Sequence, residues 1–181
     1  MKINKKKQNV FCVKKDKMAV IITCVCILVI SLAVIALIFD MIDNPANVCF
    51  DCIVISAFIA LSAYFAFMSP TKIELTDDAV IVHRVLGRKI FRYVDIKSVE
   101  RFSGDCGFRL WGSGGFFGYV GLFSSKDLGR HFEYVGDFKE AFLIVLVSGH
   151  KYVLSCVDSS RVVNALSARI EGRRFNSNFI L

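Results

Sequence analysis

Two long apolar stretches near the N-terminus precede a region in which short apolar segments alternate with polar turns. Met18 to Phe39 contains no charged residue, and a helix of that length reaches about 33 Å, enough to cross the hydrocarbon core of a bilayer. The second stretch, Val48 to Met68, follows a connector, residues 40–47, that contains the turn former Pro45. The pattern predicts transmembrane helices at 18–39 and 48–68, joined as a hairpin by a short external connector.

A cleaved signal peptide is the alternative interpretation of the first stretch, because lysines also precede its apolar run. That run is longer than the usual hydrophobic region of a signal peptide, and no small-residue cleavage site follows in residues 40–43. Asp51 lies one turn from the start of the second helix, where its carboxylate is expected to reach the lipid headgroups. Under either interpretation the second stretch anchors the chain.

Lysines gather before the first apolar stretch and are missing from the connector. Residues 1–17 form a basic arm with the lysines Lys2, Lys5, Lys6, Lys7, Lys14, Lys15 and Lys17. Because cytoplasmic segments carry the excess of Lys and Arg, these residues determine the expected topology: both termini of a multi-pass membrane protein are cytoplasmic. Much of the net charge of +7 lies in an arm suited to anionic lipid headgroups, so we expect no nucleic-acid partner.

Past residue 70 the pattern changes to short strands separated by glycine or polar turns, which is typical of a β-sandwich or barrel. The expected strands are 71–76, 79–85, 88–93, 98–103, 117–124, 129–136, 140–147 and 151–156. The turn at residues 148–150 predicts that the last two pair as a hairpin.

An amphipathic helix is predicted after the strands. Asp158 or Ser159 can cap its start, and Gly172 stands where a helix stop is expected, which leaves residues 173–181 as a C-terminal tail. The apolar positions on one face are Val162, Val163, Leu166 and Ile170. We expect this face to close an open end of the β-structure.

Three parts of the chain carry a family resemblance. They are residues 73–82 (IELTDDAVIV) with the later Ile90 and Asp95-Ile96-x-x-Val99, the glycine-aromatic run of residues 109–123 (RLWGSGGFFGYVGLF), and the ending in a hairpin and a helix. Behind two apolar helices, they resemble the bacterial pleckstrin-homology-like (PH-like) domains of small membrane proteins, over residues 71–172. The resemblance implies a mainly-β PH-like barrel or sandwich of about seven or eight strands closed by a C-terminal α-helix, and an assembly or binding module without a catalytic centre.

One departure concerns the first hairpin of the domain. Members of the wider PH superfamily that bind phosphoinositides carry a basic cluster there, because Lys and Arg neutralise phosphates. Here the turn is Thr76-Asp77-Asp78-Ala79, whose carboxylates repel a phosphate. We therefore expect no inositol-lipid recognition at that turn.

The glycine-aromatic run is the candidate contact site. Its glycines do not follow the spacing of a phosphate-binding loop and lead from strand to strand, so we interpret them as permitting bulges and close backbone approach. The side chains that could contact a protein partner or the membrane are Arg109, Trp111, Phe116 and Phe117. Packing in the domain core is the competing interpretation of these aromatic residues.

Residues capable of catalysis or metal binding do not form a recognisable motif. Ser113 lies in G-S-G rather than G-x-S-x-G, and the three histidines fall on separate elements. Cys49 and Cys52 form a C-x-x-C pair on the outer side of the predicted hairpin. The leading hypothesis is therefore a non-enzymatic, cofactor-free interaction module that binds a protein partner or itself. The alternative is a small transmembrane sensor that responds to redox conditions through the Cys49 and Cys52 pair.

Overall fold

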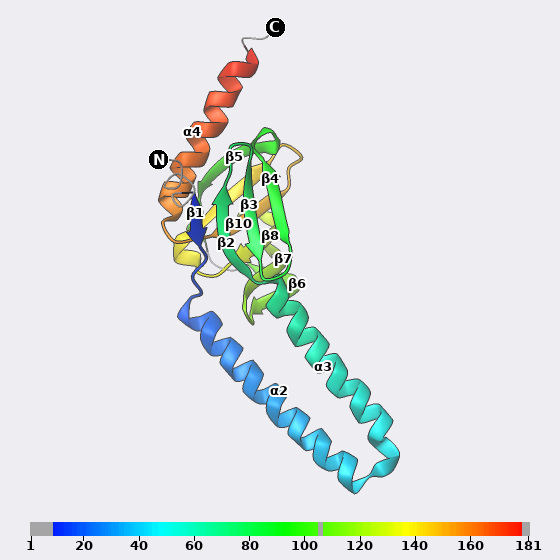
Figure 1. The fold of residues 1–181 in the computed structure, drawn as a ribbon. Helices are drawn as coiled ribbons and strands as arrows, with labels where there is room; N and C mark the ends of the chain where they lie inside the picture. The colour runs from blue at the N-terminus through cyan, green and yellow to red at the C-terminus, as the bar shows by residue number, and fades with distance from the viewer. Residues whose placement is uncertain (1–8, 105–106, 179–181) are drawn as a thin grey trace, which may run out of the picture.

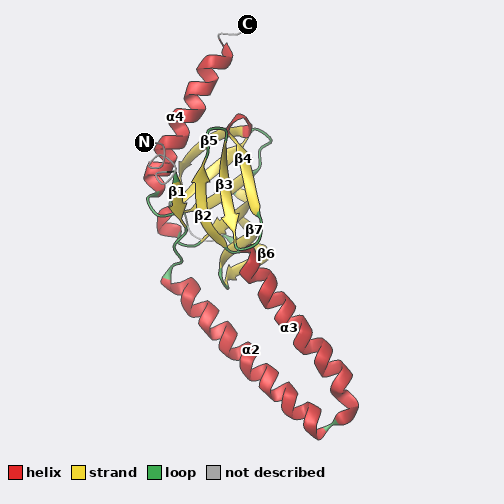
Figure 2. Ribbon diagram, in the orientation of Figure 1, coloured by secondary structure: helices red, strands yellow, loops and turns green. Residues whose placement is uncertain are grey.

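The computed structural model describes residues 9–104 and 107–178, with residues 173–178 as backbone only. Two long apolar helices leave one end of a β-rich domain as a hairpin, and the final helix leaves the other end (Figure 1 and Figure 2). The hairpin consists of α2 (Lys17–Asp43) and α3 (Val48–Met68), joined by the 3-10 turn η1 (Pro45–Asn47). Both helices are long and apolar enough to cross a membrane.

The ends of the hairpin differ in detail from the sequence prediction. Asp16 caps α2 by accepting a hydrogen bond from the Ala19 amide (2.6 Å). At the other end α2 continues to Asp43, because Asn44 donates from its backbone and its side chain to Asp40 (both 2.8 Å), so the connector is shorter than residues 40–47. Asp51 does not point outward as expected but is buried in the first turn of α3, where the helix dipole favours a carboxylate.

The domain contains two sheets with strand orders β1-β2-β3-β4 and β5-β9-β10-β8-β7-β6. The strands of the first sheet are β1 (Val10–Cys12), β2 (Pro70–Leu75), β3 (Ala79–Arg84) and β4 (Arg88–Arg92). Those of the second are β5 (Ile96–Arg101), β6 (Phe108–Gly115), β7 (Gly118–Ser125), β8 (Gly129–Val135), β9 (Ala141–Leu146) and β10 (Lys151–Ser155). Short 3-10 turns lie at η2 (Tyr93–Asp95) and η3 (Phe138–Glu140). The predicted hairpin of β9 and β10 is confirmed as an antiparallel pair.

Two strands lie where the sequence pattern did not predict them. β1 is drawn from the basic arm and pairs antiparallel with β2, placing Phe11 opposite Ile73, so part of the arm belongs to the folded domain. β6 occupies the glycine-rich segment that was expected to be a loop. Glycine is disfavoured inside strands because it supplies no side chain to pack, which is why propensity alone misses β6.

The core lies between the two sheets, and α4 (Ser159–Asn178) closes it. Strand alternation builds the core from the first sheet: Ile73 and Leu75 are buried on β2, whereas the intervening Glu74 is only partly covered. From α4, the predicted apolar face supplies Leu166 and Ile170, both buried in the same cluster. The prediction that this helix closes the β-structure is confirmed.

α4 continues past the stop expected at Gly172. Its backbone is helical to Asn178, so the predicted tail, residues 173–181, begins as helix. Gly172 is exposed and does not adopt a left-handed conformation. A glycine inside a helix costs only about 1 kcal/mol relative to alanine, which does not by itself end a helix without a following proline.

Candidate functional site

The glycine-aromatic run forms the β6–β7 hairpin at the end of the domain from which the apolar helices leave (Figure 1). Gly112 lies opposite Gly121 in this hairpin, with φ angles of +115° and +145°. A Cβ on either residue would collide with the backbone of the facing strand. The register also shifts between Arg109 and Trp111. The prediction that these glycines permit a bulge and close backbone approach is confirmed.

The tip of the hairpin is joined to α2 by Thr23. The Thr23 hydroxyl accepts a hydrogen bond from the Phe117 amide (2.9 Å) and donates to the Ala19 carbonyl of its own helix (2.6 Å), with the Gly115 carbonyl oxygen 3.2 Å away. Ile22 packs so closely on Gly115 that a Cβ there would lie 2.7 Å from its Cδ1. A side chain at 115 would displace the Ile22 side chain, and the φ of +121° is a conformation that residues other than glycine rarely adopt.

The same tip is joined to α3. Ser69, directly after α3, donates from its hydroxyl to the Phe117 carbonyl (2.7 Å). Phe117 has a φ of 60°, a left-handed conformation that is unfavourable for a bulky residue. Its amide donates to Thr23 on α2, and its carbonyl accepts from Ser69, the residue that follows α3. These two bonds offset the strain and fix the hairpin to both helices.

Aromatic rings extend the contact along α3. The Phe116 ring meets Phe65 edge to face with 6.3 Å between centroids, and the Trp111 ring meets Tyr64 in the same geometry at 6.1 Å. Trp111 remains 61% exposed, and Phe116 is half-buried. These aromatic residues therefore pack on the chain's own helices and not in the core between the sheets.

The remaining predicted contact residues surround this junction. Arg109 is exposed and makes no ion pair with a described residue. The ammonium group of Lys15 lies 5.4 Å from the centre of the Phe117 ring, and burial lowers its pKa. Lys14 and Lys17 flank it at the start of α2. The predicted topology residues Lys2, Lys5, Lys6 and Lys7 lie outside the described part of the chain.

Comparison with known protein families assigns the β-rich domain. The bacterial PH domain family matches residues 71–170, more than half of the chain. The chain belongs to the bacterial PH domain family. Comparisons with curated proteins and with solved structures found no match. Two sheets closed by a C-terminal helix are consistent with the PH fold, and the predicted fold class is confirmed.

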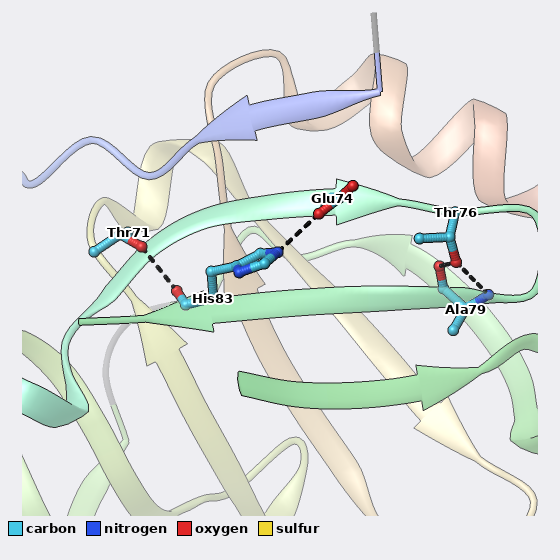
Figure 3. Close-up of polar contacts among 5 residues, drawn as sticks. All are labelled: Thr71, Glu74, Thr76, Ala79 and His83. Carbon is cyan, nitrogen blue, oxygen red and sulfur yellow. Dashed lines mark hydrogen bonds and ion pairs between the residues drawn. The ribbon is translucent and has the colours of Figure 1, made fainter. Parts of the chain in front are cut away.

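The first hairpin of this bacterial PH domain, β2–β3, carries polar contacts of its own (Figure 3). Thr71 donates to the His83 carbonyl (3.1 Å), and the His83 ring lies 2.9 Å from the Glu74 carboxylate. The Thr76 hydroxyl accepts from the Ala79 amide (3.0 Å), closing the turn. Since β2 leaves α3 directly, this turn lies at the far end of the strand from the apolar helices (Figure 1).

The β2–β3 turn is also tied to α4. Arg169 donates to the Thr76 carbonyl (2.6 Å) and to the Tyr93 hydroxyl (2.8 Å). Arg169 thus serves a structural contact at the turn, and Asp77 and Asp78 are exposed. The turn is acidic and directed away from the helices, and the absence of inositol-lipid recognition there stays a prediction.

Sequence reasoning missed a buried charged pair in the PH domain. His131 and Glu133 are fully buried on β8, with 2.9 Å between Nε2 and Oε1, and His131 Nδ1 lies 2.8 Å from the Gly129 carbonyl. Burial lowers the pKa of His131, but the hydrogen bonds to Glu133 and Gly129 and the charge of Glu133 outweigh it, so this pKa is raised. The H-x-E spacing on one strand was the signal that could have revealed the pair.

The other candidate reactive residues are not brought together. Cys49 and Cys52 are exposed at the start of α3, the end of the hairpin that is remote from the PH domain, and Cys106 lies outside the described residues. Burial raises the pKa of the Cys156 thiol to about 12. Ser113 is buried and donates to the Phe116 carbonyl (2.6 Å), a contact within the hairpin. Within residues 9–104 and 107–178 no three His, Cys, Asp or Glu side chains gather as a metal site.

Proposed function

We propose that this chain is a membrane-anchored interaction module. In this proposal α2 and α3 cross a bacterial inner membrane, both termini are cytoplasmic, and the PH domain is held against the cytoplasmic leaflet. The length and apolarity of the two helices support the anchoring, and the lysines at the start of α2 support the orientation. The domain binds a protein partner or a second copy of itself and carries out no catalysis.

The observation that supports an interaction role is the exposed edge strand β6. It pairs with β7 on one side and, among the described strands, has no neighbour on the other. Large apolar side chains lie exposed along it, with Phe108 77% and Leu110 44% exposed. An open strand edge with apolar side chains is the surface to which a partner adds a strand. Because the tip of this hairpin is held by α2 and α3, the edge has a defined position beside the membrane.

The second candidate, redox sensing through Cys49 and Cys52, has weaker support. The pair is separated from the PH domain by nearly the whole of α3, about 30 Å at 1.5 Å per residue. Any signal would have to pass along that helix. The edge strand, in contrast, belongs to the domain itself.

Site-specific photo-crosslinking in intact cells tests the proposal. A photoreactive amino acid at Leu110 should crosslink to one defined protein, either this chain or another. The matched control is the same amino acid at Ile90 on β4, an edge-strand position in the other sheet that is 46% exposed. A Phe108→Glu substitution should remove the Leu110 crosslink. Equal products at both positions, or products that survive Phe108→Glu, would contradict the edge-strand proposal.

A further inference from the structure

A groove lies between the two apolar helices, directly beside the β6–β7 hairpin. Its volume is about 260 Å³. α2 and α3 supply a mostly apolar wall, and the hairpin supplies the end nearest the domain. The lining residues are Cys26, Ile30, Phe58, Leu61, Ser62, Phe65, Arg109, Gly112, Ser113 and Phe116.

The depth of the groove matches one leaflet of a bilayer. Its lining runs from Phe65 to Phe58 on α3 and to Ile30 on α2. At 1.5 Å per residue these positions lie about 5 to 20 Å from the helix ends that adjoin the domain. Half of a hydrocarbon core is about 15 Å thick. The groove therefore lies within the leaflet on the side of the PH domain, and its lining, about 10 Å long on α3, can contact the upper part of an acyl chain.

Arg109 supplies the charge that an apolar groove alone would lack. Its guanidinium lies beside Gly114, near the hairpin tip, with Nη1 3.6 Å from the position of a Cβ on that glycine. It makes no ion pair with any described residue. A guanidinium presents several donors to a phosphate and remains charged at every physiological pH. A cation at one end and apolar side chains below it complement an anionic amphiphile.

We propose that this groove binds one anionic glycerophospholipid from the cytoplasmic leaflet. Its phosphate pairs with Arg109, and an acyl chain lies between α2 and α3. The inference rests on the proposed function, because the groove lies at leaflet depth only when both helices cross the membrane. It differs from lipid recognition at the β2–β3 turn, which is acidic and lies at the other end of strand β2.

The single tryptophan of the chain provides the test. Trp111 lies on β6 between Arg109 and Gly112, so its fluorescence reports lipid close to the groove. The full chain is reconstituted in phosphatidylcholine vesicles that contain either brominated phosphatidylglycerol or brominated phosphatidylcholine as a quencher. The wild type should prefer the anionic quencher by about tenfold, because phosphatidylcholine presents the same phosphate together with a trimethylammonium group that repels the Arg109 guanidinium.

Two pairs of variants distinguish lipid binding in the groove from nonspecific electrostatic attraction to the membrane surface. Arg109→Gln should remove most of the preference, whereas Arg130→Gln, an exposed arginine on β8, should retain it. Ser62→Phe fills the groove without changing charge and should also remove the preference. Ser56→Phe is its control, because Ser56 lies on the same helix outside the groove.

Membrane extraction and lipid preference together distinguish failure of the lipid-groove proposal from failure of the membrane-anchor proposal. If alkaline carbonate extracts the chain from cell membranes, both the anchoring and the groove proposals fail. If the chain resists extraction but shows no anionic preference, or keeps it in Arg109→Gln and Ser62→Phe, only the groove proposal is overturned. If Ser62→Phe changes the yield of crosslinked dimer while the wild type shows no lipid preference, the groove holds a second copy and the lipid proposal is likewise overturned.

Discussion

At the scale of single residues, several polar side chains make hydrogen bonds in buried or partly buried positions of this fold. His131 and Glu133 are both fully buried on β8 and bonded to each other. Thr23 lies in an apolar helix but bonds to the tip of a distant hairpin. A buried polar group without a partner is strongly unfavourable. Thr23 therefore specifies how α2 meets the β6–β7 hairpin, whereas His131 and Glu133 satisfy each other within β8.

The His131 and Glu133 pair predicts a pH-dependent stability. The pKa of His131 is raised in the folded chain, whereas in the unfolded chain it titrates near its ordinary value of about 6.5. A raised folded pKa stabilises fully below the unfolded pKa, and this contribution is lost as the pH rises through the folded pKa. The Tm of the full chain in detergent should therefore fall as the pH is raised from about 6 to about 9.

Two substitutions check the source of that dependence. Glu133→Gln removes the charge that holds the proton on His131, so the fall in Tm over the same pH range should become smaller. His150→Gln changes an exposed histidine and should leave the fall as it is. An unchanged pH profile in Glu133→Gln would assign the effect to other groups.

At the scale of elements, the β6–β7 hairpin is the connection between the PH domain and the apolar helices. Sequence reasoning identified the glycine-aromatic run and its chemistry but expected a loop before residue 117. It offered a protein partner, the membrane or the core as the surroundings of Phe116 and Phe117. The structure places them against α2 and α3 of the same chain, an arrangement that residues separated by some fifty to ninety positions do not reveal through local patterns.

Thr23→Val should loosen this connection without disturbing the core. The valine leaves the Phe117 amide without its hydrogen bond in a position that α2 covers, a loss of about 1–3 kcal/mol. Hydrogen exchange of the turn at residues 115–118 should become faster in the full chain. Ser31→Ala is the control, because the Ser31 hydroxyl donates only to Ile27 of its own helix. Equal exchange rates in the two variants would show that Thr23 does not hold the turn.

At the scale of the whole molecule, the two ends of the domain differ: the two apolar helices leave one end, and α4 leaves the other (Figure 2). The end with the helices carries the hairpin, the groove and the lysines at the start of α2. The opposite end carries the acidic β2–β3 turn and α4. A PH domain held this way turns its first hairpin away from a membrane that α2 and α3 would cross.

The proposed topology predicts the behaviour of reporter fusions. A reporter that is active only in the cytoplasm should be active when fused after Leu181, because the lysine-rich arm and the residues after α3 carry the positive charge. The same reporter inserted after Ala46 in the connector should be inactive. A reporter that is active only outside the cytoplasm should show the reverse pattern. Any other combination would contradict the cytoplasmic placement of the PH domain.

The sequence alone determined the classes of element and the family. An unbroken apolar run such as 18–39 must be covered by lipid or protein. Alternating apolar and polar residues, as in β2, indicate a strand with one buried face. The apolar face with Leu166 and Ile170 indicated a closing helix for the same reason. These patterns are local, since each residue's neighbours along the chain show which of its faces must avoid water.

Only the tertiary structure decided which segments meet. β1 pairs with β2, which follows about sixty residues later. β6 forms despite its glycines because β7 pairs with it. Phe117 adopts a left-handed conformation because its hydrogen bonds with Thr23 and Ser69 stabilise it. The burial of His131 and Glu133 likewise follows from the packing around β8. An apolar or polar face indicates that another segment must cover it. It does not indicate which segment, because long-range pairing depends on the combined shape and hydrogen bonding of the whole fold.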